Sequence, residues 1–273
     1  MIYQKKGTKN KFINFNVNNT VVVTDFDATL TTASCKSSWA LLTESKTMPI
    51  EFYEQINKLN EKYAPYETDM LLLESVKENL TSEWSRKEFE LLFNNEYKEK
   101  YLSDTISSSD TPIKFRKGVK QFLSFLNKHN IKLFIVSAGI SNSIELLLKK
   151  NKCLYPNITI ISNKIIFENN IAKCLENDEI VNLYNKNIIT EKYLSNIIDD
   201  NKNILLFGDV LNDANMCDNL KYKNIIKVGF FEKKSDDLFK YYKNTYDLVC
   251  TNNSNFIELI KVLFNKSSGI NFI

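Results

Sequence analysis

The chain has 273 residues, of which 43% are hydrophobic and 25% charged, and its formal net charge is +3. This length and composition are typical of one large α/β domain or two modest domains around a substantial core. The near balance of 36 basic and 33 acidic residues provides no electrostatic footprint for nucleic acid. We therefore expect a small-molecule substrate and no nucleic-acid partner.

The cysteines and the N-terminal segment bear on location. The five cysteines are widely spaced, without a CxxC pair, which is typical of reduced thiols in a cytosolic protein. The segment MIYQKKGTKNKFINF lacks the apolar run of a secretory signal, and no stretch approaches the roughly 18 apolar residues of a membrane span. We expect a cytoplasmic protein without membrane contact. The single histidine excludes a multi-histidine metal site.

Short runs rich in Val and Ile predict strands, and helical patterns lie between several of them. The predicted strands are 20–24, 131–136, 158–161, 203–207, 225–228 and 248–250. Their alternation with helices predicts an α/β fold with a doubly wound parallel sheet, covered by helices on both faces. The segment IISNKIIFENNIAKCL has apolar residues on both sides of Asn169-Asn170 and predicts a β-hairpin.

Residues 33–117 interrupt this alternation with amphipathic helical stretches and no convincing strand. Pro49 and Ser82 in this block are typical of helix starts. A helical block inserted after the first strand of an α/β sheet indicates a cap domain. The predicted organisation is a catalytic core of residues 1–32 and 118–273 and a helical cap of residues 33–117.

Three of the predicted strands end on polar residues. Those residues are Asp25 and Asp27 after the first strand, Ser137-Ala138-Gly139 after the second, and Gly208-Asp209 with Asp213 after the fourth. Because the carboxyl ends of parallel strands meet at one edge of a sheet, we expect several carboxylates and a hydroxyl to lie together. Close carboxylates repel unless a cation lies among them, and an oxygen-only set of ligands favours Mg²⁺.

Such a cluster can perform phosphoryl transfer. Asp25, at the end of a strand, can attack a phosphoryl group and form an acyl-phosphate. Asp27 can then protonate the leaving oxygen and later activate water, and Thr29 is placed to steady it by hydrogen bonding. Ser137 and the backbone N–H of Ala138 would hold phosphate oxygens. Gly139 would let the chain turn tightly after them. A fixed cation, normally a lysine, is also needed.

The motifs DFDATLT, VSAG and GDVLND resemble motifs I, II and IV of the haloacid dehalogenase-like phosphohydrolases. From Ser137 onward, segments such as VSAGISNSIELLL, ISNKIIFENN and ILLFGDVLNDANMCD resemble the cytosolic pyrimidine 5'-nucleotidase (type III) family nearly end to end. This resemblance implies a Mg²⁺-dependent phosphatase that hydrolyses nucleoside 5'-monophosphates to nucleoside and phosphate. It also implies a preference for pyrimidines (UMP or CMP) and an aspartyl-phosphate intermediate.

The resemblance further implies roles for individual residues. Asp25 and Asp27 would be the catalytic residues. Asp25, the main-chain carbonyl of Asp27 and Asp209 would hold the metal, with Asp213 in or just behind the metal shell. Ser137, Ala138 and Lys186 would bind phosphate. Lys186 is implied because Asn185-Lys186 matches an Asn-Lys pair of the family. The residues alone leave other lysines open, and Lys164 in "SNK" is the main alternative.

In the cap the resemblance becomes weaker. The segment YETDM resembles a family motif and makes Glu67 the candidate for hydrogen bonding the nucleobase. The alternative is that Glu67 lies near a helix N-terminus and interacts favourably with the helix dipole. Trp84 aligns with a tryptophan of the family that lies in the cap. The alternative is that Trp84 is simply an aromatic residue in the core of the cap. A serine that lies near the substrate in the family aligns with Glu88 here, so the base preference stays open.

Three other functions are compatible with some of these features. The same chemistry could act on another small phosphomonoester, such as phosphoserine or a sugar phosphate. The phosphoryl group could instead pass to a nucleoside, as in a phosphotransferase. A non-catalytic binding module is disfavoured, because it would be expected to lose the nucleophile or a metal carboxylate, and both are present. We expect a monomer or a weak dimer.

Overall fold

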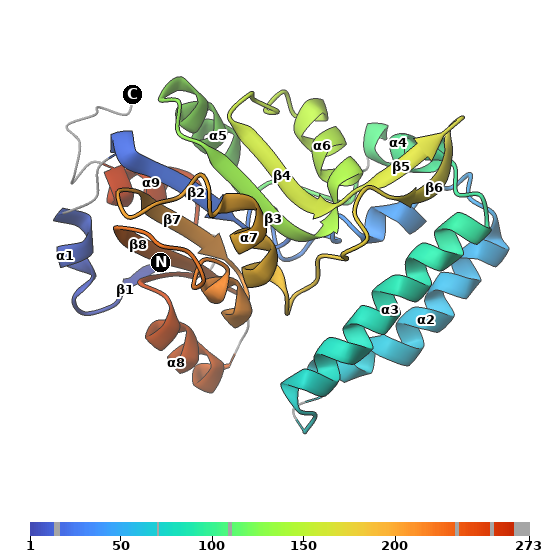
Figure 1. The fold of residues 1–273 in the computed structure, drawn as a ribbon, viewed down its shortest axis with the longest axis horizontal. Helices are drawn as coiled ribbons and strands as arrows, with labels where there is room; N and C mark the ends of the chain where they lie inside the picture. Colours follow the sequence, from blue (N-terminus) through green and yellow to red (C-terminus); the bar gives the residue numbers. More distant parts are fainter. Residues whose placement is uncertain (14–16, 70, 109–110, 233–234, 252–253, 265–273) are drawn as a thin grey trace.

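A seven-stranded sheet forms the centre of the protein, with a pair of long helices projecting to one side (Figure 1). The computed structural model describes residues 1–13, 17–69, 71–108, 111–232, 235–251 and 254–264. The strand order is β1-β9-β8-β7-β2-β3-β4, and every pair is parallel except β1 with β9. The strands are β1 (Ile2–Gln4), β2 (Thr20–Thr24), β3 (Leu133–Ile140), β4 (Ile158–Asn163), β7 (Asn203–Gly208), β8 (Asn224–Phe231) and β9 (Leu248–Thr251). The predicted α/β fold is confirmed; only the antiparallel edge strand β1 was not foreseen.

Helices cover both faces of this sheet. Val22 of β2 packs into one apolar cluster, whereas Val21 and Val23 pack into the other, because successive side chains of a strand point to opposite faces. Burial on both sides explains why these strands read as continuous apolar runs. The helices are α5 (Val119–Lys128), α6 (Ser141–Lys150) and α9 (Phe256–Phe264) on the first face, and α7 (Lys186–Leu194) and α8 (Asp236–Thr245) on the second. The short α1 (Thr8–Ile13) lies against β8.

The block predicted as a cap is helical in the structure. It contains η2 (Ala40–Thr43), α2 (Ile50–Thr68), α3 (Glu74–Asn94) and α4 (Glu99–Ser107). Helix α2 begins after Pro49, as predicted, but α3 runs straight through Ser82, so the prediction of a helix start there is wrong. The Ser82 hydroxyl instead accepts a hydrogen bond from Asn182 of the core at 3.2 Å. Although α2 and α3 are long, both are polar, and among the described residues no helix could cross a membrane.

The predicted hairpin is also present and lies beside the cap (Figure 1). Its two strands are β5 (Ile165–Glu168) and β6 (Ile171–Leu175). Asn169 and Asn170 connect them with φ values of 51° and 64°, the left-handed conformation that asparagine tolerates. The Ala172 N–H donates to the carbonyl oxygen of Tyr97 at 2.8 Å. A segment of the predicted core thus pairs with a segment of the cap.

Candidate active site

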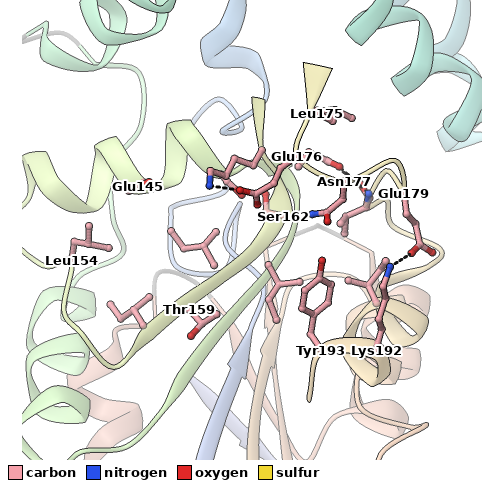
Figure 2. Close-up of a pocket in the computed structure, with 18 of the residues that line it drawn as sticks. Glu145, Leu154, Thr159, Ser162, Leu175, Glu176, Asn177, Glu179, Lys192 and Tyr193 are labelled. Carbon is pink, nitrogen blue, oxygen red and sulfur yellow. Dashed lines mark hydrogen bonds and ion pairs between the residues drawn. The ribbon is translucent and has the colours of Figure 1, made fainter. Parts of the chain in front are cut away.

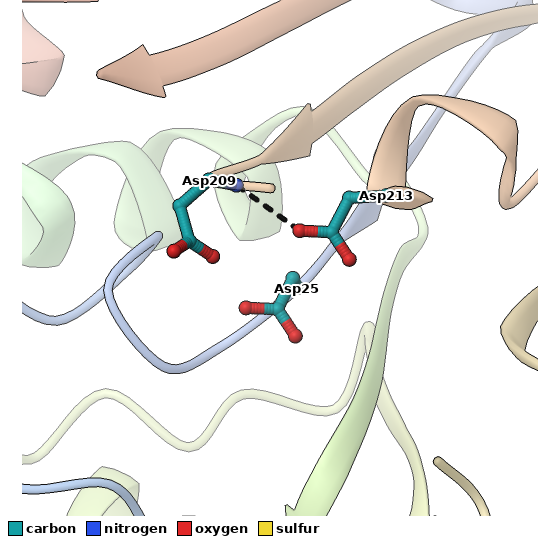
Figure 3. Close-up of side chains that lie close together, drawn as sticks. All are labelled: Asp25, Asp209 and Asp213. Atoms are coloured by element: carbon teal, nitrogen blue, oxygen red, sulfur yellow. Dashed lines mark hydrogen bonds between the residues drawn. The ribbon is translucent and has the colours of Figure 1, made fainter. Parts of the chain in front are cut away.

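Three carboxylates meet at the carboxyl ends of β2 and β7 (Figure 3). Ligand oxygens of Asp25, Asp209 and Asp213 all lie within 4.8 Å of one another. Asp25 follows β2 directly, and its N–H donates to the carbonyl oxygen of Phe207 on β7 at 3.0 Å. The parallel pairing of the two strands therefore fixes the distance between the carboxylates that follow them. The structure brings together the three residues that the sequence placed at this edge.

A buried lysine completes this cluster. Lys186 begins α7, and its Nζ lies 2.7 Å from Asp25 Oδ1 and 2.7 Å from Asp213 Oδ1. Burial alone would lower the pKa of Lys186, but the adjacent carboxylates of Asp213 and Asp25 outweigh it and raise that pKa, so the side chain stays charged. One cation therefore faces three carboxylates.

The alternative lysine lies elsewhere. Lys164 forms an ion pair with Glu176 beside a cavity of about 630 Å³ that runs along the edge strand β4 (Figure 2). Lys192, another lysine between the motifs, pairs with Glu179 in the same cavity. None of the three clustered aspartates lines this cavity. Lys186 is therefore the lysine that the fold delivers to the strand-end carboxylates.

The cluster is short of positive charge. Burial raises the pKa of Asp25, Lys186 opposes this effect, and the neighbouring Asp213 adds to it. Burial and the charges of Asp213 and Asp25 raise the pKa of Asp209 well above its usual range. Three clustered carboxylates with an uncompensated negative charge suit a small hard cation such as Mg²⁺, and Asp25 and Asp209 are residues that could hold one.

Asp213 is held differently from the other two carboxylates. Its Oδ2 accepts the backbone N–H groups of Asp209 and Val210 at 3.1 and 3.2 Å, while its Oδ1 accepts from Lys186. A Cβ on Gly208 would lie 2.2 Å from the Asp213 Cβ, so only glycine fits beside it. Asp213 therefore orients the loop and the lysine from behind, within reach of a cation.

Asp27 is positioned by a residue that the sequence did not reveal. Its two carboxylate oxygens accept the Ser38 N–H at 2.7 Å and the Ser38 hydroxyl at 2.6 Å. The prediction that Thr29 steadies Asp27 is wrong, because the Thr29 hydroxyl donates to Asp209 Oδ1 at 3.3 Å. Between Asp27 and Thr29, Ala28 has a φ of 55°, in the left-handed region. Burial raises the pKa of Asp27, and both Ser38 hydrogen bonds oppose that rise.

The SAG segment lies inside a strand. We expected a strand end at Val136 and a turn at Gly139, but β3 continues through this segment. Gly139 is required for close approach instead: a Cβ there would lie 1.9 Å from Ser38 Oγ. The same Cβ would be 3.0 Å from Asp27 Oδ2 and 3.2 Å from Ser137 Oγ. The absence of a side chain at Gly139 therefore leaves room for Ser38, the Asp27 carboxylate and the Ser137 hydroxyl to lie close to one another.

A cavity of about 550 Å³ extends from Asp27 into the cap. Its lining includes Asp27, Ala138, Gly139 and Asn182 from the core, and Trp39, Glu67, Trp84 and Glu88 from the cap. Burial raises the pKa of Glu88 to about 8, the indoles of Trp84 and Trp39 oppose this effect, and Glu67 adds to it. The residue Glu67 as a whole is exposed, but its carboxyl group is partly buried. This partial burial raises the pKa of Glu67 as well. Trp84 stacks on Tyr63 with ring centroids 6.2 Å apart.

A parallel α/β core with strand-end carboxylates, a buried lysine and a helical cap defines a haloacid dehalogenase-like phosphohydrolase. Solved structures share this fold. A crystal structure of cytosolic 5'-nucleotidase IIIB bound to cytidine has a TM-score of 0.81 at 22% identity, covering 96% of this chain and 92% of that chain. A phospho-aspartyl intermediate analogue of phosphoserine phosphatase has a TM-score of 0.53 at 18% identity, covering 89% of this chain and 98% of that chain.

The family follows from the sequence match. The model of the pyrimidine 5'-nucleotidase (UMPH-1) family matches residues 22–265. The human 7-methylguanosine phosphate-specific 5'-nucleotidase is 30% identical over 239 residues, which cover 84% of this chain and 78% of that protein. The chain belongs to the pyrimidine 5'-nucleotidase family and is a phosphoric monoester hydrolase, as its motifs predicted.

Proposed function

We propose that the protein hydrolyses nucleoside 5'-monophosphates, with a preference for UMP and CMP, through an aspartyl-phosphate on Asp25. One observation carries this proposal: Lys186 occupies Oδ1 of Asp25, while Oδ2 accepts no hydrogen bond from the residues that the structure describes. The nucleophile is thus fixed in place with one oxygen free for attack. Asp27 stands beside it on the same strand-to-loop segment.

The proposed reaction has two steps. In the first, an Asp25 oxygen bonds to phosphorus, the bond from phosphorus to the 5'-oxygen breaks, and Asp27 gives its proton to that oxygen. In the second, Asp27 takes a proton from water, the water oxygen bonds to phosphorus, and the Asp25–phosphorus linkage breaks. Both steps use the same two carboxylates, and the Ser38 hydrogen bonds keep Asp27 in one orientation throughout.

Asp25, the carbonyl oxygen of Asp27 and Asp209 would hold Mg²⁺, with Asp213 behind them. The bound cation would neutralise phosphate charge and the charge of the nucleophile. Ser137, the N–H of Ala138 and Lys186 would bind the phosphate oxygens, because all three lie at the same sheet edge. Lys186 would also keep its pairing with Asp213 during turnover.

The nucleoside would occupy the 550 Å³ cavity, with its base toward the cap and Glu67 as a hydrogen-bond partner. A second candidate substrate is 7-methylguanosine 5'-monophosphate, which is favoured by the name of the human relative and by the acidic, indole-lined end of the cavity. Its cationic base would be attracted by carboxylates and by aromatic faces. We also propose that the protein acts in the cytoplasm, since its cysteines are free thiols. Its oligomeric state is proposed to be a monomer or weak dimer.

The test is phosphate release from UMP, CMP, AMP and 7-methyl-GMP with Mg²⁺, using the Asp25→Asn variant as background. The panel should include phosphoserine and ribose 5-phosphate, and a nucleoside acceptor in a parallel reaction would reveal phosphotransfer. We expect turnover of the nucleotides at least about 10³-fold above the background, because the nucleophile splits the reaction into two easier steps. Equal release by wild type and variant from every nucleotide would refute the proposal.

A further inference from the structure

Strand β3 bulges relative to β4 at residues 137–139, the segment that supplies phosphate ligands in the proposed site. Val136 pairs with Ile161 and Ile140 pairs with Asn163, so four residue steps on β3 correspond to two steps on β4. The extra residues of a bulge are left out of the regular ladder, and bulges beside active sites redirect side chains. The conformation of this segment therefore depends on contacts other than strand pairing.

Two side chains at the end of β4 make such contacts. The Ser162 hydroxyl donates to the carbonyl oxygen of Gly139 at 2.8 Å. The Asn163 Nδ2 donates to the carbonyl oxygen of Ala138 at 2.9 Å. This bond fixes the peptide group between Ala138 and Gly139, whose N–H in turn donates to Ser137 Oγ at 3.1 Å. Because the Ser137 hydroxyl accepts this hydrogen bond, its own proton points elsewhere and can be donated to a phosphate oxygen.

Asn163 also holds the segment that leads to Lys186. Its Nδ2 donates to the carbonyl oxygen of Val181 at 2.9 Å, and its Oδ1 accepts the Val181 N–H at 2.8 Å. Residues 176–185, all of which the structure describes, lie outside every helix and strand, so no ladder positions them. The clamp on Val181 therefore anchors the irregular segment from which α7 and Lys186 start.

One buried amide thus joins the two segments of the proposed phosphate site. Asn163 is 4% exposed, and both its Nδ2 and its Oδ1 are used in these bonds. Ala138 and Val181 are far apart in the chain, yet they share this one side chain. An apolar side chain at position 163 would remove the donor from both carbonyl groups, and a buried carbonyl without its donor drives a local rearrangement.

We infer that Asn163, assisted by Ser162, is a positioning residue for phosphate. It acts through the main chain of Ala138 and Val181 and sets how the Ser137 hydroxyl and the Lys186 ammonium lie relative to each other. This inference rests on the proposed phosphate site. Preorganised donors bind the charge of a phosphoryl group best when their positions are fixed by a supporting set of hydrogen bonds.

The experiment measures the Ki of inorganic phosphate as a competitive inhibitor of p-nitrophenyl phosphate hydrolysis, together with kcat. The enzymes are wild type, Asn163→Ala and the matched control Asn157→Ala. Asn157 precedes the other end of β4, and its Nδ2 donates to the carbonyl oxygen of Ile131 at 2.7 Å. The control therefore loses the same kind of hydrogen bond, away from the site.

We expect Ki to rise about tenfold in Asn163→Ala and to change by less than about twofold in Asn157→Ala, because only the first displaces phosphate ligands. A purely structural role has a different signature. Poor folding lowers the number of active molecules and so the apparent kcat, but it leaves Ki unchanged.

The outcomes are distinct. If the Ki of Asn163→Ala equals that of wild type, the inference is overturned, even where kcat falls. If Asn163→Ala does not fold, Ser162→Ala decides: its Ki should rise about threefold, since it loses one of the side-chain contacts to the bulge, and an unchanged Ki overturns the inference. A wild type that hydrolyses p-nitrophenyl phosphate but no nucleotide refutes the proposed function, while the comparison of Ki values still tests the role of Asn163.

Discussion

The carboxylates at the sheet edge and the carboxyls in the cap differ in how they are partnered. At the sheet edge, Asp25 and Asp213 share Lys186 at 2.7 Å each, and backbone N–H groups occupy the second oxygen of Asp213. In the cap, Glu88 is buried beside the indoles of Trp84 and Trp39, whose N–H groups oppose the rise in its pKa, and the nearby Glu67 adds to that rise. The first set is held by a cation and by backbone N–H groups, whereas the second has only neutral donors. Burial of a carboxyl is therefore offset more strongly at the sheet edge than in the cap.

The two regions also differ in what anchors them. The sheet-edge residues follow strands that are buried on both faces, and their positions are set by the parallel ladder between β2 and β7. The cap residues stand on two helices, α2 and α3, whose few buried apolar side chains join the main core cluster. Side-chain hydrogen bonds such as Asn182 to Ser82 and Asn212 to Glu74, both 3.2 Å, add to this contact. The sheet-edge residues are therefore positioned by a backbone ladder, and the cap residues by side-chain contacts.

We expect the largest effect when the Mg²⁺ proposed to bind the sheet-edge carboxylates is removed. Chelation of Mg²⁺ should reduce turnover by about 10³-fold or more, because Asp25 and Asp209 then repel the phosphate. Thermal melting gives a readout independent of activity: Mg²⁺ at about 100 times its Kd should stabilise wild type by about 2.7 kcal/mol. Asp209→Asn should lose most of this stabilisation. An equal shift in both proteins would show that the cation binds elsewhere.

The second prediction separates the two lysines. Lys186→Met should reduce kcat by about 10²–10³-fold, because a fixed cation against the phosphate is lost. It should also destabilise the metal-free protein by about 3 kcal/mol, since Asp25 and Asp213 lose their buried partner. Lys164→Met is the matched control: Lys164 is paired on the surface with Glu176, and its loss should change neither quantity measurably. Equal loss of activity in both variants would reverse the assignment.

The third prediction tests whether burial raises the pKa of the cap carboxyl Glu88. The folded-state pKa of Glu88 is about 8, above the ordinary value of 4.5, so the folded protein binds this proton more tightly than the unfolded chain. The resulting stability is complete below about pH 4.5 and is lost as the pH rises through 8. Glu88→Gln carries no such group, so its stability relative to wild type should increase by about 4 kcal/mol between pH 5 and pH 9.

Urea unfolding at four pH values measures this difference, with Glu90→Gln as control. The control should show a flat difference, because Glu90 is exposed on the same helix. A flat difference for Glu88→Gln as well would mean that folding does not raise the pKa of Glu88. The contrast between the two regions would then disappear.

The sequence predicted Asp25 and Asp209 because each of them follows a buried strand, and parallel strands deliver their carboxyl ends to one edge. Ser137 was named for the same reason, although β3 continues past it to Ile140. Lys186 could not be placed in this way, because it starts a helix after a long irregular segment, and only the family resemblance selected it over Lys164. Ser38 was missed for the same reason. It reaches Asp27 from an irregular segment, where no periodicity reports which side chain turns inward.

The missed residue provides the last and smallest prediction. Ser38→Ala removes one of two hydrogen bonds to Asp27 and keeps the backbone N–H, so kcat for a nucleotide should fall about tenfold. The loss should be smaller for p-nitrophenyl phosphate, because nitrophenolate leaves without needing a proton. Thr29→Val is the informative comparison: its hydroxyl donates to Asp209, so it should weaken Mg²⁺ binding by about tenfold and leave kcat at saturating Mg²⁺ unchanged. An equal loss on both substrates in Ser38→Ala would show that Ser38 supports the fold of the loop, and not the orientation of the acid.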